Sequence, residues 1–122
     1  MARAETVVLV VEDETLVRMG IVDHLIDEGF TVLEASNADE AVAILTSNLD
    51  IRIVFTDVDM PGSMDGLKLA AAVRRRWPPI KIVVTSGHRK VAIEELPGEA
   101  QFFSKSYNPY KVAAALRSLA GL

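Results

Sequence analysis

The feature that most constrains the fold of this 122-residue chain is a regular alternation of two patterns. Short runs rich in Val, Ile and Phe alternate with stretches whose apolar residues recur at the period of a helix. Strands are expected at residues 6–11, 30–35, 51–56, 81–86 and 100–104. Two of these runs are almost continuously apolar, which is typical of strands covered on both faces. The alternation predicts an α/β fold, with a parallel sheet between two layers of helices and right-handed crossovers.

The stretches between the strands have the apolar spacing and the end signals of helices. Helices are expected at residues 15–28, 38–47, 66–76 and 109–119, with a weaker candidate near 90–96. Asn37 with Glu40 three positions later resembles a capping box, and Asn108 before Pro109 is a typical helix start. The first helix is expected to bury one apolar stripe, made of Leu16, Met19, Val22, Leu25 and Ile26.

Composition limits the function classes that this chain can serve. Half of its residues are apolar, enough for the core of one domain, which we expect to cover residues 1–122. The absence of cysteine excludes disulfides and thiolate chemistry. The apolar run near the start is too short for a membrane span or a signal peptide, so we expect a cytoplasmic protein with no membrane contact. The net charge of −4 argues against nucleic-acid binding.

Polar residues follow four of the predicted strands, at the edge where open sheets of this type bind their ligands. They are Glu12, Asp13, Asp57, Asp59, Thr85 and Lys105. Taken alone, Asp13 could equally cap the helix at 15–28. Three converging carboxylates, however, are unfavourable unless positive charge lies among them. Lys105 supplies one charge, and Mg²⁺ would supply two, because it takes one or two carboxylates and leaves room for phosphate oxygens.

Such a site permits phosphoryl transfer, which needs a nucleophile in line, a metal and fixed hydrogen-bond donors. Asp57 could be that nucleophile, because a carboxylate can form an aspartyl phosphate. Lys105 and the Thr85 hydroxyl would then hold the transferred oxygens. The chain has neither a Gly-x-x-x-x-Gly-Lys loop nor a Gly-x-Gly-x-x-Gly motif, so neither usual nucleotide site is supported.

Four segments resemble the receiver domains of two-component response regulators, and the resemblance extends from Val7 to Leu119. VVEDE resembles the acidic pair of this family, TDVDMPGSMDG its phosphoacceptor loop, VVTSG its hydroxyl residue and FFSKS its lysine. The resemblance implies a flavodoxin-like, doubly wound (βα)5 fold. In that fold the five parallel strands have the order 2-1-3-4-5, with helices on both faces, as in single-domain regulators of the chemotaxis type.

The resemblance also implies roles for the acids. Asp57 would be the phosphorylated aspartate. Glu12 and Asp13 would hold Mg²⁺ directly or through water, and Glu12 stands where the family often has aspartate. Asp57 and the backbone carbonyl of Asp59 would complete the protein ligands of the metal.

Three further residues would contact the phosphoryl group or respond to it. Thr85 and Lys105 would bind it, and Thr85 and Phe102 would act as the switch. Phe102 also suits a core position, and the alternation of a strand puts Phe102 and Phe103 on opposite faces. The family usually has a cis bond from this lysine to a proline, whereas Ser106 follows here. Since a cis bond before a non-proline residue costs about 2.5–4 kcal/mol, we predict a trans Lys105–Ser106 bond.

The implied function is phosphorelay signal transduction. A sensor histidine kinase or a phosphotransfer protein would donate the phosphoryl group, and phosphorylation would change contacts with a downstream protein or a second copy of the chain. The domain would catalyse only its own phosphorylation and dephosphorylation. Two alternatives stay open. One is a haloacid-dehalogenase-like phosphatase with Asp57 as nucleophile, although there the nucleophile lies on the first strand. The other is a binding module that has lost phosphorylation.

Overall fold

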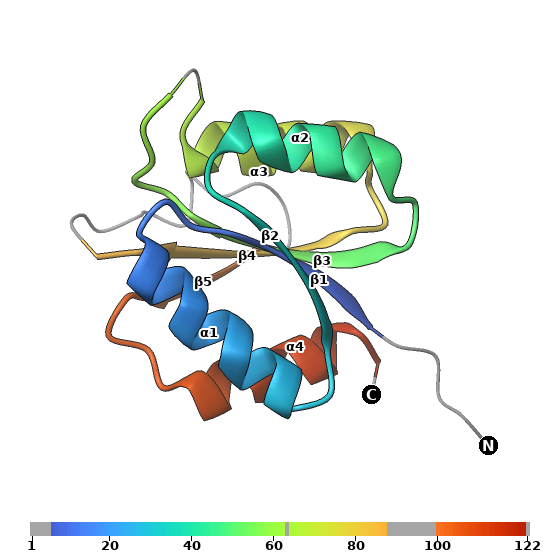
Figure 1. Ribbon diagram of the computed structural model, residues 1–122. Helices are drawn as coiled ribbons and strands as arrows, with labels where there is room; N and C mark the ends of the chain where they lie inside the picture. The colour runs from blue at the N-terminus through green and yellow to red at the C-terminus, as the bar shows by residue number, and fades with distance from the viewer. Residues whose placement is uncertain (1–5, 63, 88–99, 122) are drawn as a thin grey trace.

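The computed structural model describes residues 6–62, 64–87 and 100–121, which form one parallel sheet between two layers of helices (Figure 1). The strands are β1 (Val7–Val11), β2 (Thr31–Ala35), β3 (Ile51–Asp57), β4 (Lys81–Ser86) and β5 (Gln101–Ser104). They lie in the order β2-β1-β3-β4-β5, and every neighbouring pair is parallel. The predicted fold class and strand order are therefore confirmed.

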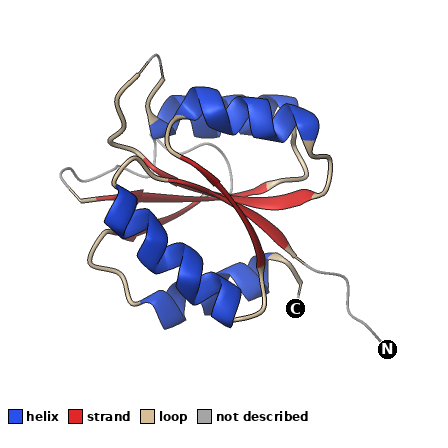
Figure 2. Ribbon diagram, viewed as in Figure 1, coloured by secondary structure: helices blue, strands red, loops and turns tan. Residues whose placement is uncertain are grey.

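Helices cover both faces of the sheet (Figure 2). They are α1 (Thr15–Asp27), α2 (Ala38–Ser47), α3 (Gly66–Arg76) and α4 (Pro109–Leu119). Helices α2 and α3 pack on one face, and α1 and α4 pack on the other (Figure 1). The weaker helix expected near 90–96 lies outside the described residues. None of the helices in the described ranges is long and apolar enough to cross a membrane.

The core consists of two apolar clusters, one on each face of the sheet. In β1, Val8 and Val10 belong to the cluster under α1 and α4, whereas Leu9 and Val11 belong to the cluster under α2 and α3. All of β1 is buried, as is β3 except for its second residue. This two-sided burial explains why the strand sequences read as continuous apolar runs. The buried positions of β1 and β3 also determine where the polar residues at the ends of these strands lie.

The apolar stripe predicted for α1 is partly wrong. Leu16, Met19 and Ile26 are each at least half exposed. The residues that α1 buries are Ile21, Val22 and Leu25. At 3.6 residues per turn the helix carries two neighbouring apolar stripes, and the sheet covers only one of them. The second stripe is left on the surface.

The predicted helix starts are confirmed in their main features. The Asn37 side chain accepts a hydrogen bond of 2.8 Å from the Glu40 backbone N–H at the start of α2. The Glu40 carboxylate does not return to Asn37, as a strict capping box would require. It accepts instead from the backbone and hydroxyl of Ser36, at 2.8 and 2.9 Å. Asn108 caps α4 by accepting from the Tyr110 N–H at 2.9 Å.

Candidate functional site

Three acids meet at the carboxyl edge of the sheet, where the sequence predicted a site. Glu12, Asp13 and Asp57 each offer a carboxylate oxygen, and these oxygens lie within 4.8 Å of one another. Glu12 and Asp57 are buried, and Asp13 is half-buried. Glu12 comes directly after β1, and Asp57 is the last residue of the adjacent strand β3. The pairing of these two central strands therefore brings the acids together.

Lys105 lies among the acids, as predicted, but it has one partner that was not predicted. Its Nζ is 2.9 Å from Glu12 Oε1 and 3.1 Å from Asp57 Oδ2. It also donates a hydrogen bond of 3.0 Å to Oε1 of Glu14, whose side chain is half exposed. The only sequence signal for Glu14 was its place as the third acid in the run that follows β1.

The position of Lys105 is set by its backbone and by a neighbouring glycine. The Lys105 N–H donates to the Ser86 carbonyl at 3.1 Å. The Lys105 stem passes Gly87, where an added Cβ would lie 3.1 Å from Lys105 Cδ. The Lys105–Ser106 bond is trans, which confirms the prediction. The lysine thus reaches the acids without the cis-proline that the family usually has at this point.

Thr85 lies directly beside Asp57, because the two residues are paired in the register of β3 and β4. Thr85 is buried, and its carbonyl accepts a hydrogen bond of 2.8 Å from the Val58 N–H. On the other side, the Thr56 hydroxyl donates to the Asp57 carbonyl at 3.0 Å. The backbone around Asp57 is therefore held by hydrogen bonds on both sides.

Asp59 contacts the site through its backbone rather than its carboxylate. Its N–H donates to Asp57 Oδ1 at 3.2 Å. Its carboxylate accepts a hydrogen bond of 2.8 Å from the Ser86 hydroxyl, a partner that the sequence did not identify. Among the acids that the structure describes, the three-carboxylate group does not include Asp59. The metal role of the Asp59 carbonyl stays a prediction.

The two phenylalanines of β5 lie on opposite faces of the sheet, as their alternation predicted. Phe102 packs against the cluster under α2 and α3, and Phe103 packs against the cluster under α1 and α4. Both are half-buried. Phe102 is paired with Val84, the residue before Thr85. Phe102 is thus close along the sheet to Thr85, and its switch role stays a prediction.

The Asp13 side chain does not cap α1, and one of its carboxylate oxygens has no hydrogen-bond partner among the described residues. The N-cap of α1 is Glu14, so the alternative role of Asp13 as the helix cap is wrong. Asp13 Oδ1 is buried and has no hydrogen-bond partner among the described residues. A buried polar atom without a partner costs free energy, which a bound cation would recover. The three carboxylates form a hard oxygen donor set that suits Mg²⁺.

The pKa values of these groups reflect an excess of buried negative charge. Burial raises the pKa of Glu12 to about 7, although the Glu14 N–H and Lys105 act to lower it. Burial likewise raises the pKa of Asp57 above its ordinary value. Burial alone would lower the pKa of Lys105, but its contacts with Glu12, Glu14 and Asp57 outweigh that effect and raise it. One lysine therefore does not neutralise the site.

We predict that the metal-free protein becomes less stable as the pH rises from 4.5 to about 7. Folding raises the pKa of Glu12 from 4.5 to about 7, so the folded state binds a proton that the unfolded state has released. The free energy of unfolding should fall across this window by about 2 kcal/mol. Chemical denaturation at both ends of the window measures the change.

The same measurement on Glu12→Gln provides the control, because glutamine has no proton to lose. Glu28 and Glu40 have lowered pKa values, so their effects fall below this window, whereas the raised pKa of Asp57 acts in the same direction as that of Glu12 and persists in the variant. Saturating Mg²⁺ should also reduce the loss, since the metal stabilises the ionised acids. A metal-free protein whose stability rises with pH in this range would contradict the prediction.

Comparisons with known proteins agree with this geometry. Residues 8–117 match the family model described as the response regulator receiver domain. The chain is 42% identical over 97 residues to the sensor kinase CckA of Brucella abortus, which covers 78% of this chain and 10% of that protein. It is 32% identical over 114 residues to an NtrX-like response regulator of Rickettsia felis, covering 90% of this chain and 24% of that protein.

A solved structure is similar over almost its whole length. The crystal structure of a response regulator receiver protein from Sinorhizobium medicae matches with a TM-score of 0.87 and 26% identity, covering 96% of this chain and 95% of that one. By contrast, the chain spans less than a quarter of the length of either curated relative.

Proposed function

Because the chain belongs to the response regulator receiver family, we propose that it accepts a phosphoryl group on Asp57 and relays it as a signal. A receiver domain of a two-component phosphorelay is not a conventional enzyme. The observation that supports Asp57 most strongly is its buried carboxylate, held 3.1 Å from Lys105 and grouped with Glu12 and Asp13. Membership of the receiver family argues against the alternative of a haloacid-dehalogenase-like phosphatase. In addition, the acidic pair here precedes Asp57, which ends the third strand.

The proposed reaction moves one phosphoryl group from a donor histidine to the Asp57 carboxylate. A carboxylate oxygen forms a bond to phosphorus as the phosphorus–nitrogen bond of the phosphohistidine breaks, and the electron pair of that bond stays on the imidazole. The product is an acyl phosphate. The burial of Asp57 keeps bulk water away from the reacting atoms, although the donor must reach them at the open edge.

The acids and Lys105 would have different roles in the transfer. Glu12, Asp13 and Asp57, with the Asp59 carbonyl, would hold Mg²⁺, which when bound neutralises charge on the phosphoryl oxygens. Lys105 Nζ now contacts three carboxylates, and it would exchange part of these contacts for the phosphoryl oxygens. Because Lys105 keeps a positive charge throughout, it stabilises charge that develops during transfer.

The switch would begin at Thr85. Thr85 is paired with Asp57 in the register of β3 and β4, which supports a role in which its hydroxyl would donate a hydrogen bond to a phosphoryl oxygen. Movement of Thr85 toward the phosphoryl group would free space along β4. Phe102, half-buried on the adjacent strand, would move into it and alter the surface near β5. A downstream protein would recognise that altered surface.

A sensor histidine kinase or a phosphotransfer protein is the proposed donor, and the exposed stripe of α1 is its proposed docking surface. Leu16 and Met19 are exposed in the first half of α1. This part of the helix follows Glu14, which contacts Lys105, so the stripe begins beside the site. Exposed apolar side chains next to a reaction centre are typical of a protein contact.

Intact mass spectrometry with a small phosphodonor tests the function. In the presence of Mg²⁺ we expect the mass to rise by one phosphoryl group per chain. A chelator should prevent the increase, and hydroxylamine should remove the group, because it cleaves acyl phosphates. No labelling in Mg²⁺, or steady hydrolysis of a phosphate monoester, would contradict the proposal.

A further inference from the structure

We propose that Arg18 is a positioning residue for the metal-binding acids and that it acts through the backbone of Glu12. The inference rests on the proposed function, because it concerns the same site. Arg18 Nη1 donates a hydrogen bond of 2.6 Å to the Glu12 carbonyl. The Arg18 side chain is only 17% exposed, so bulk water weakens this contact little. The sequence motifs gave Arg18 no role.

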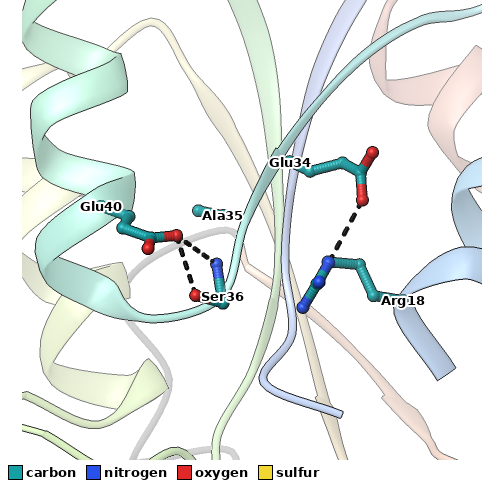
Figure 3. Close-up of a pocket in the computed structure, with 5 residues that line it drawn as sticks. All are labelled: Arg18, Glu34, Ala35, Ser36 and Glu40. Atoms are coloured by element: carbon teal, nitrogen blue, oxygen red, sulfur yellow. Dashed lines mark hydrogen bonds and ion pairs between the residues drawn. The ribbon is translucent and has the colours of Figure 1, made fainter. Parts of the chain in front are cut away.

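One planar guanidinium connects three elements of the fold. Arg18 lies in the first turns of α1, and its Nη1 reaches the chain just beyond β1. Its Nε donates at 3.2 Å to Glu34 Oε1 on β2, the contact drawn in Figure 3. A guanidinium offers several donors in a fixed fork, so it can hold both oxygens at a set angle. A lysine offers a single charged centre and cannot reproduce this arrangement.

The contact between Arg18 and the Glu12 carbonyl matters because Glu12 lies just beyond the end of β1, where the regular hydrogen bonds of the sheet stop. The Glu12 N–H donates to the Ala35 carbonyl of β2 at 3.0 Å, so the neighbouring strand holds that side of the residue. Arg18 binds the Glu12 carbonyl on the other side. That carbonyl belongs to the rigid peptide plane shared with Asp13. Fixing the plane therefore fixes where Asp13 Cα lies relative to Glu12, and this limits the positions that the Asp13 carboxylate can reach.

The hydrogen bonds of the Arg18 side chain go to these two oxygens, and, with the hydrogen bonds from Ser36, its positive charge also helps to lower the pKa of the Glu40 carboxylate. Arg18 borders a small pocket of about 130 Å³, whose other lining residues are Glu34, Ala35, Ser36 and Glu40 (Figure 3). The Glu40 carboxylate across the pocket already accepts two hydrogen bonds from Ser36. Arg18 and Lys105 thus have separate tasks. Lys105 binds carboxylates that must adjust to a metal and a phosphoryl group, whereas Arg18 binds backbone that must stay in place.

Calorimetric titration with Mg²⁺ tests the proposal, with Arg18→Ala and Arg18→Lys as the variants. Loss of a residue that orients metal ligands typically weakens metal binding by about 10- to 100-fold, which is the expected effect of Arg18→Ala. Arg18→Lys should recover part of the affinity. Glu34→Gln keeps the contact of Arg18 with Glu12, so it should bind Mg²⁺ nearly as the parent does. Arg75→Ala removes the same charge from an exposed site on α3 and should change little.

A second readout separates positioning from simple stability. The Asp13 amide belongs to the peptide plane that Arg18 holds, so its NMR shift should move in metal-free Arg18→Ala and Arg18→Lys. Folded Arg18 variants that bind Mg²⁺ as tightly as the parent would overturn the proposal. If Arg18→Ala does not fold, the Mg²⁺ affinity of Arg18→Lys tests the proposal in its place. Asp13→Asn distinguishes the two levels of failure: if it too binds Mg²⁺ like the parent, the proposed site itself is wrong.

Discussion

Replacing Asp57 with asparagine should abolish phosphorylation by a small phosphodonor. Asparagine has nearly the shape of aspartate, and its amide oxygen can still accept the hydrogen bond that Asp57 Oδ1 takes from the Asp59 N–H. It lacks the negative charge and the nucleophilic carboxylate oxygen that an acyl phosphate requires. Intact mass spectrometry in Mg²⁺ should therefore show one phosphoryl group per chain for the parent and none for Asp57→Asn.

Asp59→Asn is the matched control, because it makes the same chemical change two residues away. The Asp59 carboxylate accepts from the Ser86 hydroxyl, and asparagine can accept the same hydrogen bond. If Asp59 serves the metal only through its carbonyl, this variant should still be labelled. Labelling of Asp57→Asn at the level of the parent would show that another residue is the acceptor. Loss of labelling in Asp59→Asn would show that its carboxylate takes part.

The sequence predicted the sheet and the edge at which the candidate site residues meet for one physical reason. Parallel strands buried on both faces read as continuous apolar runs, and the carboxyl ends of such strands share one edge. Once the strands are located, Asp57 and Lys105 must end at that edge, far apart in sequence but close in space. The same reasoning placed Thr85 at this edge, and the register of β3 and β4 pairs it with Asp57.

Some features of the structure were not predicted from the sequence, because several local arrangements are compatible with the same residues. Helix α1 has two apolar stripes, and nothing local decides that Leu25 faces the sheet while Ile26 faces outward. The packing of α1 against β1 and β2 determines which of the two stripes is buried. The partners Glu14 and Ser86 depend on side-chain rotamers at loop positions, and the contact of Arg18 with Glu12 requires a backbone carbonyl that no sequence pattern marks.

Replacing Gly66 with alanine is expected to be the most disruptive small substitution near the site. Gly66 is the first residue of α3, and its N–H donates to the Val58 carbonyl at 3.0 Å. A Cβ on Gly66 would lie 1.8 Å from the Asp57 carbonyl oxygen and 2.8 Å from Val58 Cα. These are backbone atoms, so no side chain can rotate away. Helix α3 and the end of β3 must separate to admit one methyl group.

We expect Gly66→Ala to lower the free energy of unfolding by about 3 kcal/mol, at the upper end of the usual cost of overpacking. Phosphorylation should also slow, because the shift moves the backbone of Asp57. Gly20→Ala is the control: it lies within α1, and the added Cβ would meet no described atom within 4 Å beyond its chain neighbours and the nearby backbone of its own helix. That variant should gain about 0.5–1 kcal/mol from helix propensity.

Urea denaturation measures the stability of both variants, and the rate of labelling by a small phosphodonor measures the effect on the site. If Gly66→Ala were as stable as the parent, the close approach of α3 to β3 would not exist in solution. If it were destabilised but labelled at the parent rate, the position of Asp57 would not depend on this contact. A slower rate in Gly66→Ala but not in Gly20→Ala would show that the start of α3 fixes the position of Asp57 as well as the fold.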